Sequence, residues 1–241
     1  MKKILSLSAC TLFTMVVFSQ DTLVTPKKKS TIDLSNRAND HFMLQLGYTK
    51  WAGMPDTINA KGLSKSINVY FMFDFPFKTN PRLSIALGGG IGSDHILFTK
   101  TYVGIKDPTP SIRFTNQSDT NNFKKTKLAT AYFEVPVELR FSSEPMTGKG
   151  VKVALGVKVG LLLSAHTRNT KFENKANAII NDYIMKEASK RFMNKTRISG
   201  MARIGYANFS LYGSYQFTPL FKDGLGPKVN PFSIGLTLSG L

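Results

Sequence analysis

The feature that most constrains this chain of 241 residues is a two-residue alternation between apolar side chains and small or polar ones. In residues 231–241, PFSIGLTLSGL, the apolar residues Phe232, Ile234 and Leu236 are separated by serine, glycine and threonine. Successive side chains of an extended strand point to opposite faces, so this pattern predicts a strand with one apolar face. Eight segments keep the alternation: 41–51, 66–77, 82–91, 128–141, 151–165, 197–206, 209–218 and 231–241.

The second face of these segments indicates what the strands enclose. In a soluble sandwich this face would meet water, and long charged side chains would be expected along it. Here glycine, alanine and serine dominate it, with isolated charges of both signs, which suits a narrow lumen filled by its own side chains. The apolar face would then meet lipid. The residues predicted to form a charge network in the lumen are Asp74, Arg82, Glu134, Glu138, Arg140, Lys152, Lys158 and Arg203.

Connection lengths favour a membrane barrel over its soluble alternative, a lipocalin-like barrel. The connections after the second, fourth and sixth segments are short and the others are longer, as for periplasmic turns and extracellular loops. We therefore predict an all-β fold, an eight-stranded antiparallel up-and-down transmembrane β-barrel in which the last strand pairs with the first. The aromatic residues predicted to form girdles at the membrane interfaces are Tyr48, Trp51, Phe75, Phe77, Phe141, Tyr206, Phe209, Tyr215 and Phe217.

The first forty residues are predicted to lie outside the barrel. Residues 1–19 combine a cationic start, an apolar run and a small or polar stop, which is the pattern of a secretory signal peptide. The single cysteine, Cys10, has the LSAC context of a lipoprotein signal, but the apolar run continues past it, which favours its removal with the signal peptide. Residues 20–40 are predicted to be a flexible basic periplasmic linker, which leaves 41–241 as the barrel.

The long connection after the fifth segment contains the best candidate for a surface contact. In residues 170–194, apolar side chains recur at helical intervals, and Thr170 and Glu173 have the spacing of a capping box. An amphipathic helix is therefore predicted, lying on the outer leaflet or capping the barrel mouth, or else packed on its neighbours. The candidate contact residues, which would face anionic lipopolysaccharide or an acidic partner, are Lys175, Lys186, Lys190 and Arg191.

Two strand motifs carry a resemblance to a known family. The segments AYFEVPVELRF, at 131–141, and GVKVGLLLSAHT, at 156–167, together with the glycine-punctuated last strand, resemble the PorT-like family of outer-membrane β-barrels of Bacteroidetes. The resemblance covers roughly the whole chain after the predicted signal peptide. It implies an eight-stranded barrel and, through the founding member of that family, a link to type IX secretion.

Motifs for catalysis, cofactors or metals are weak. The stretch GGGIGS, at 88–93, lies in a predicted strand and lacks the spacing of a dinucleotide-binding loop. His41, His95 and His166 have no metal-ligand spacing. Ser164 and His166 share a strand face, but in the order opposite to that of outer-membrane lipid A deacylases. We therefore expect no catalytic, cofactor-binding or metal site.

These observations predict an integral outer-membrane protein, with its N-terminus in the periplasm, that is not an enzyme. It would act through loops or partner contacts in a structural or assembly role, and the alternatives are a narrow channel and a lipid-modifying hydrolase. Predicted partners are outer-membrane lipid or lipopolysaccharide and other envelope or secretion proteins. The net charge of +17 does not indicate nucleic acid, because the chain is predicted to be secreted and lacks aromatic-basic motifs.

Overall fold

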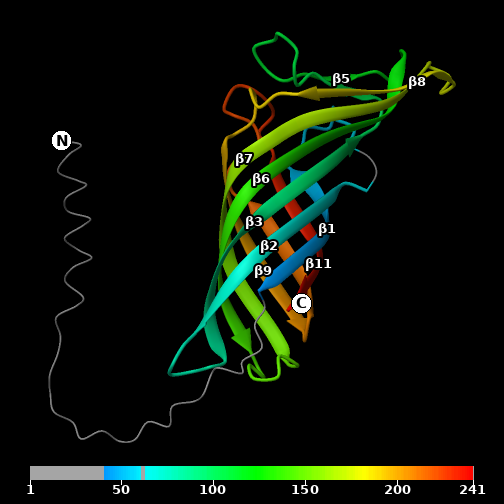
Figure 1. The fold of residues 1–241 in the computed structure, drawn as a ribbon. Coiled ribbons are helices and arrows are strands. Elements are labelled where there is room, and N and C mark those ends of the chain that lie inside the picture. The colour runs from blue at the N-terminus through cyan, green and yellow to red at the C-terminus, as the bar shows by residue number, and fades with distance from the viewer. Residues whose placement is uncertain (1–40, 61–62, 241) are drawn as a thin grey trace, which may run out of the picture. The chain divides into compact units, whose positions relative to one another are not determined.

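Eight long strands form a closed antiparallel ring in the computed structural model, which describes residues 41–60 and 63–240 (Figure 1). The ring strands are β1 (Phe42–Ala52), β2 (Lys65–Pro76), β3 (Leu83–Phe98), β6 (Asn122–Ser142), β7 (Val151–Glu173), β9 (Thr196–Tyr206), β10 (Phe209–Gln216) and β11 (Asn230–Ser239). β11 pairs with β1, so the predicted all-β barrel and its closure by the last strand are confirmed. The predicted signal peptide and linker lie outside the described residues.

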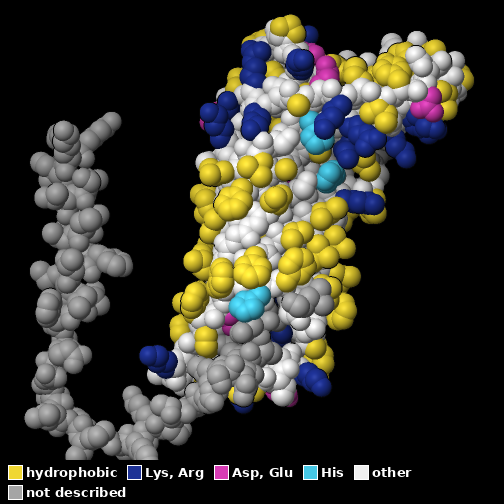
Figure 2. Space-filling model, in the orientation of Figure 1, with side chains coloured by type: hydrophobic (Ala, Val, Ile, Leu, Met, Phe, Trp, Pro, Cys, Tyr) yellow, Lys and Arg dark blue, Asp and Glu magenta, His cyan; other side chains and the backbone are white. Residues whose placement is uncertain are grey.

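The outward side chains of the ring strands form an apolar belt. It runs from Ile85 to Ile91 on β3, from Phe133 to Phe141 on β6 and from Val151 to Leu163 on β7, and continues on the other strands. On the face seen in Figure 2, apolar side chains cover the middle of the barrel. Monomeric soluble proteins rarely expose so large an apolar surface, whereas a membrane barrel must present one to lipid.

The two ends of the ring differ, and we call them the turn end and the loop end. Short connections, residues 77–82, 143–150 and 207–208, join the strands at the turn end, where β1 also begins and β11 ends. The loop end carries the long connections and the small sheet of β4 (Thr101–Val103) and β5 (Phe114–Asn116). The predicted alternation of short and long connections is therefore present.

The connections at the loop end fold into a compact hydrophobic core. Phe98, Phe192 and Phe221 are buried there, together with aliphatic residues of the 99–121 and 217–229 connections. Trp51 belongs to this core, with its ring 5.8 Å from that of Phe221, and is only 4% exposed. Its predicted place in an interfacial girdle is wrong, because its parity on β1 points inward. The other eight girdle aromatics are exposed at the barrel surface.

Residues 170–194 are not a helix, so that prediction is wrong. The end of β7 and β8 (Ile179–Ala188) form a hairpin that extends beyond the ring at the loop end (Figure 1). Asn177 adopts a positive φ of 63°, and the Asn174 side chain accepts a hydrogen bond of 3.0 Å from the Ala178 amide, which closes the turn. Thr170, predicted to cap a helix, instead pairs with Ile184. Among the residues described, no helix is long and apolar enough to cross a membrane.

A β-bulge in β7 changes which side chains face outward near the loop end. Tyr132 pairs with Leu162 but Ala131 pairs with Ser164, so Leu163 is an extra residue on β7. Because strand parity reverses at an extra residue, the side chains of 164, 166 and 168 face outward and those of 165, 167 and 169 face the lumen. The last three are buried, as this reversal requires.

Candidate functional site

Buried charges inside the barrel form two clusters. The loop-side cluster consists of Asp94, Glu134, Lys158 and Arg197, and the turn-side cluster of Asp74, Glu138, Arg140 and Arg203. The loop-side residues come from β3, β6, β7 and β9, and the turn-side residues come from β2, β6 and β9. Most of the contacts therefore join strands that are not paired with each other, such as β3 with β9 and β6 with β9. These clusters contain six of the eight residues predicted to form the charge network, and a seventh, Lys152, lines the cavity beside the turn-side cluster.

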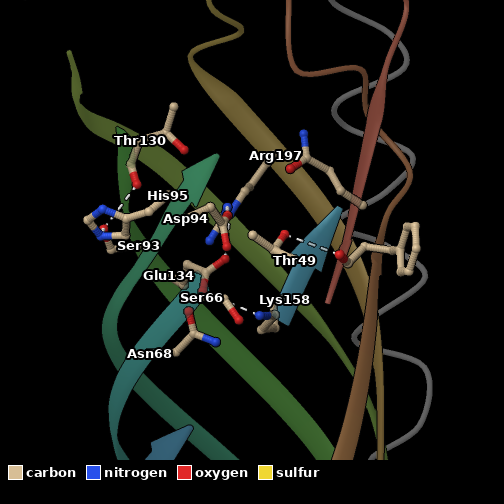
Figure 3. Close-up of polar contacts among 12 residues, drawn as sticks. Thr49, Ser66, Asn68, Ser93, Asp94, His95, Thr130, Glu134, Lys158 and Arg197 are labelled. Carbon is tan, nitrogen blue, oxygen red and sulfur yellow. Dashed lines mark hydrogen bonds and ion pairs between the residues drawn. The ribbon is translucent and has the colours of Figure 1, made fainter. Parts of the chain in front are cut away.

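Arg197 is the centre of the loop-side cluster (Figure 3). Its Nε donates to Glu134 Oε1 at 2.6 Å, and its Nη1 donates to Asp94 Oδ2 at 2.7 Å. The other oxygen of Glu134 accepts a hydrogen bond from the Tyr70 hydroxyl and lies 3.5 Å from Lys158 Nζ. The guanidinium group of Arg197 also stacks over the ring of Tyr132 at 4.1 Å. Two acids balance two bases, as buried charges require.

Gly92 on β3 provides the space that this cluster occupies. A Cβ atom built at that position would collide with the Glu134 carboxylate and the Arg197 guanidinium. Gly88 and Gly90 are equally confined, since a Cβ atom at either position would collide with Met72 or Tyr70. Close approach inside a crowded lumen therefore explains these three glycines of the 88–93 stretch.

The turn-side cluster is centred on Glu138. Its Oε2 accepts hydrogen bonds from Arg140 Nε at 2.7 Å and Arg203 Nη2 at 2.8 Å. Arg140 Nη1 also lies 3.8 Å from Asp74 Oδ1, which is an ion pair too long for a hydrogen bond. A cavity of about 30 Å³ borders the cluster, and Lys152 lines it. That volume suits about two water molecules, which would accept hydrogen bonds from the buried guanidinium groups.

Arg82 is the predicted network residue that the structure places elsewhere. Its side chain is exposed in the turn before β3, because the strand begins at Leu83 and the inward parity does not extend to residue 82. Conversely, the predicted charge network did not include Asp94 and Arg197. Asp94 lies beyond the predicted end of its strand, whereas Arg197 shares the parity of Arg203 and could have been included on that signal.

The four predicted surface bases do not form one helical face. Lys175 lies in the β7–β8 turn, 3.9 Å from Asp119, and both groups are exposed, so this pair contributes little. Lys186 lies on β8, opposite Arg168 of β7. Lys190 and Arg191 follow β8 and are exposed, and the guanidinium of Arg191 lies 5.2 Å from the centre of the Phe192 ring.

The Ser164–His166 pair and the metal-ligating residue types were the candidates for chemistry in the described part of the chain. Ser164 and His166 both face outward, and no hydrogen bond joins them; His95 instead lies 3.0 Å from Ser93 Oγ (Figure 3). Among the described residues, no group of three or more histidine, cysteine, aspartate or glutamate side chains is placed to hold a metal ion.

Comparison with known proteins places the sequence among outer-membrane barrel domains. A family model described as "Outer membrane protein beta-barrel domain" matches residues 18–222. Two solved structures of Ail, the attachment invasion locus protein of Yersinia pestis, are similar to the chain. The one in complex with the heparin analogue sucrose octasulfate is 11% identical, covers 82% of this chain and 94% of that chain, and has a TM-score of 0.33. The other is 12% identical, with coverages of 83% and 98% and a TM-score of 0.34. No curated protein matches.

Proposed function

The chain belongs to the family of outer membrane protein beta-barrel domains, and from this premise we propose that it is a barrel with a closed lumen that acts through its loop-end surface. It is an integral outer-membrane protein. The observation that carries the proposal is that the lumen is filled: two clusters of buried charges lie inside it, and the hydrophobic core covers its loop end. A barrel of eight strands has room for little beyond its own side chains.

The proposal predicts that the folded protein does not conduct ions. Folded protein is recognised on SDS gels by a mobility that changes when the sample is boiled, because a closed barrel resists SDS. Inserted into a planar bilayer, this material should give no sustained conductance steps, whereas a larger open porin inserted in the same way provides the positive control. Sustained conductance from the folded chain would contradict the closed lumen and would favour the narrow channel.

The loop end is proposed to face the cell exterior, with the N-terminus in the periplasm. The connections support this orientation, because outer-membrane barrels have short periplasmic turns and longer extracellular loops. A secretory signal peptide at residues 1–19 would deliver the chain across the inner membrane. In this orientation Lys175, Lys186, Lys190 and Arg191 are exposed where anionic lipopolysaccharide or an acidic envelope protein would meet them.

A structural or assembly role, without enzymatic activity, fits this arrangement. The Ser164–His166 pair provides no base in contact with a nucleophile, so the hydrolase alternative has no geometric support among the described residues. Membership of the PorT-like family of Bacteroidetes, and through it a link to type IX secretion, rests on the strand motifs at 131–141 and 156–167. Co-purification of secretion proteins with the chain from native outer membranes would test that link.

A further inference from the structure

A group of basic side chains gathers on the outer wall between the apolar belt and the loop end. In Figure 2, lysine, arginine and histidine side chains gather in this zone of the visible face. We call it the outer-wall cluster, and it consists of Lys65, His95, Lys127, His166, Arg168 and Lys186. These residues come from five adjacent strands, β2, β3, β6, β7 and β8.

The strand register aligns these side chains in two rows. In one row, Lys127 of β6 is directly opposite Arg168 of β7, and Arg168 is directly opposite Lys186 of β8. Directly opposite side chains on one face of a sheet have Cβ atoms about 4.5–5.5 Å apart, and like charges in that position destabilise the sheet.

The second row lies nearer to the apolar belt, at the next outward-facing position along each strand. Lys65 of β2 is opposite His95 of β3, and Ala129 of β6 separates His95 from His166 of β7. The bulge at Leu163 is what turns His166 and Arg168 outward. Without that extra residue, both side chains would point into the lumen and neither row would be complete.

No carboxylate of the described residues neutralises the positive charge of the cluster. Within the described part of the chain, none of the six residues forms an ion pair with a carboxylate. The nearest acid along β3, Asp94, is turned into the lumen and bound to Arg197. Partial burial lowers the pKa of Lys127, and the neighbouring charges of Arg168 and Lys186 lower it further.

The histidine at the centre of the zone experiences the same positive field. Partial burial lowers the pKa of His166, and the surrounding bases Lys186, Lys127, His95 and Arg168 lower it further. A bound anion would relieve the repulsion between these like charges, and the described residues supply none in contact with them.

A groove beside the rows combines this charge with apolar surface. Leu63, Ile67 and Leu97 line the groove, together with the cluster residues Lys65, His95 and Lys127. Ile67 also belongs to the exposed apolar surface of β2, so the groove is continuous with the lipid-facing belt. A molecule that fits both the charged row and the apolar groove must have an apolar chain inside the bilayer and an anionic group at the bilayer surface.

We propose that the outer-wall cluster binds the phosphate group of an anionic outer-leaflet lipid, with one acyl chain of that lipid in the groove. The site lies where the belt ends, and therefore at the depth at which lipid headgroups begin. This inference rests on the proposed orientation only for the choice of leaflet. Phosphate recognition itself follows from the register and the charges.

Binding of lipid A to the folded, detergent-solubilised protein, measured by native mass spectrometry, tests the proposal. The variant K127Q/R168Q/K186Q removes the row of Lys127, Arg168 and Lys186, which we call the upper row. Each base near an anionic surface contributes to the free energy of binding, so the loss of three should weaken lipid A binding about a hundredfold at low salt. The matched control, K78Q/R82Q/K149Q, also replaces two lysines and one arginine, but at exposed positions of the turn end. Its lipid A binding should change by less than about threefold.

Two further arms identify the ligand chemistry. Dephosphorylated lipid A should bind the wild type and the upper-row variant equally weakly, because it lacks the recognised group. Inorganic phosphate in large excess should not displace lipid A, because it leaves the groove empty. Displacement by phosphate would mean a free-anion site, and equal losses in the two triple variants would mean unspecific attraction; either result overturns the proposal.

The single variant R168Q distinguishes a loss of lipid A binding from a folding defect of the triple variant. Because Arg168 lies between two like charges, its replacement should leave the heat-modifiable mobility unchanged and should still weaken lipid A binding about tenfold. If R168Q fails to fold, the row has a structural role and the proposal is wrong. These outcomes are independent of conductance, so the closed lumen and the lipid site can fail separately.

Discussion

Glu134→Gln is the most direct perturbation of the loop-side cluster, because it preserves the shape of the side chain and removes its charge. In the wild type the fully buried carboxylate lies 2.6 Å from Arg197 Nε and 3.5 Å from Lys158 Nζ. After the substitution both cations remain, but only Asp94 balances them, so one buried positive charge is uncompensated. Removing one partner of a buried ion pair costs about 3–5 kcal/mol, which is the expected loss in the free energy of unfolding.

Denaturant unfolding in lipid vesicles, followed by tryptophan fluorescence, measures this loss. Trp51 is the single tryptophan of the chain and is buried in the loop-end core, so its emission reports unfolding without a label. Adding Lys158→Met to Glu134→Gln removes the second charge and leaves Arg197 paired with Asp94, so most of the lost stability should return. Glu144→Gln, at an exposed turn residue, is the control and should change stability by less than about 0.5 kcal/mol.

A loss below about 1 kcal/mol for Glu134→Gln would refute the reasoning, since this carboxylate would then be hydrated instead of held in a dry cluster. Failure of Lys158→Met to restore stability would also refute it. In that case the penalty would come from packing around residue 134 and not from unbalanced charge.

Two other substitutions test the packing of the lumen and of its cover by the same unfolding assay. Gly92→Ala places a methyl group against Glu134 and Arg197, so it should destabilise the barrel by about 1–3 kcal/mol. The control Gly213→Ala, which has open space at its Cβ position, should leave stability unchanged. Equal effects of the two substitutions would mean that packing does not require glycine at position 92. Phe221→Ala leaves a cavity beside Trp51, so it should cost about 3–5 kcal/mol and shift the Trp51 emission to longer wavelength, while conductance stays absent because the charge clusters still fill the lumen. Ion conductance by the Phe221→Ala variant would mean that the loop-end core alone closes the lumen.

The misjudged segment 170–194 shows how two periodicities can coexist in one sequence. Ile180, Tyr183 and Ile184 have helical spacing, yet in the folded protein Tyr183 packs by ring contacts against Phe123 and Phe172 while Ile184 is opposite Thr170 of β7. Neighbouring strand pairing outweighs local helical preference when a partner strand is already in place. The sequence contained the turn signal, two asparagines, but not the length of β7 that provides the partner.

The sequence by itself determined the architecture and the direction of most side chains. A period of two, repeated eight times with turns between, permits only strands, and lipid on one side requires that they close. The inward places of Glu134, Glu138 and Lys158 follow from parity alone and could be read without any contact being known.

Only the tertiary structure decided which charges meet and where parity breaks. Arg197 and Asp94 are 103 residues apart and touch because the register of several intervening strand pairs brings them to the same depth. The extra residue at Leu163 cannot be inferred locally, because a bulge is defined by the partner strand that it fails to match. Parity is a property of one strand, whereas depth and register belong to the closed ring. For that reason the row of Lys127, Arg168 and Lys186 was visible only in the folded protein.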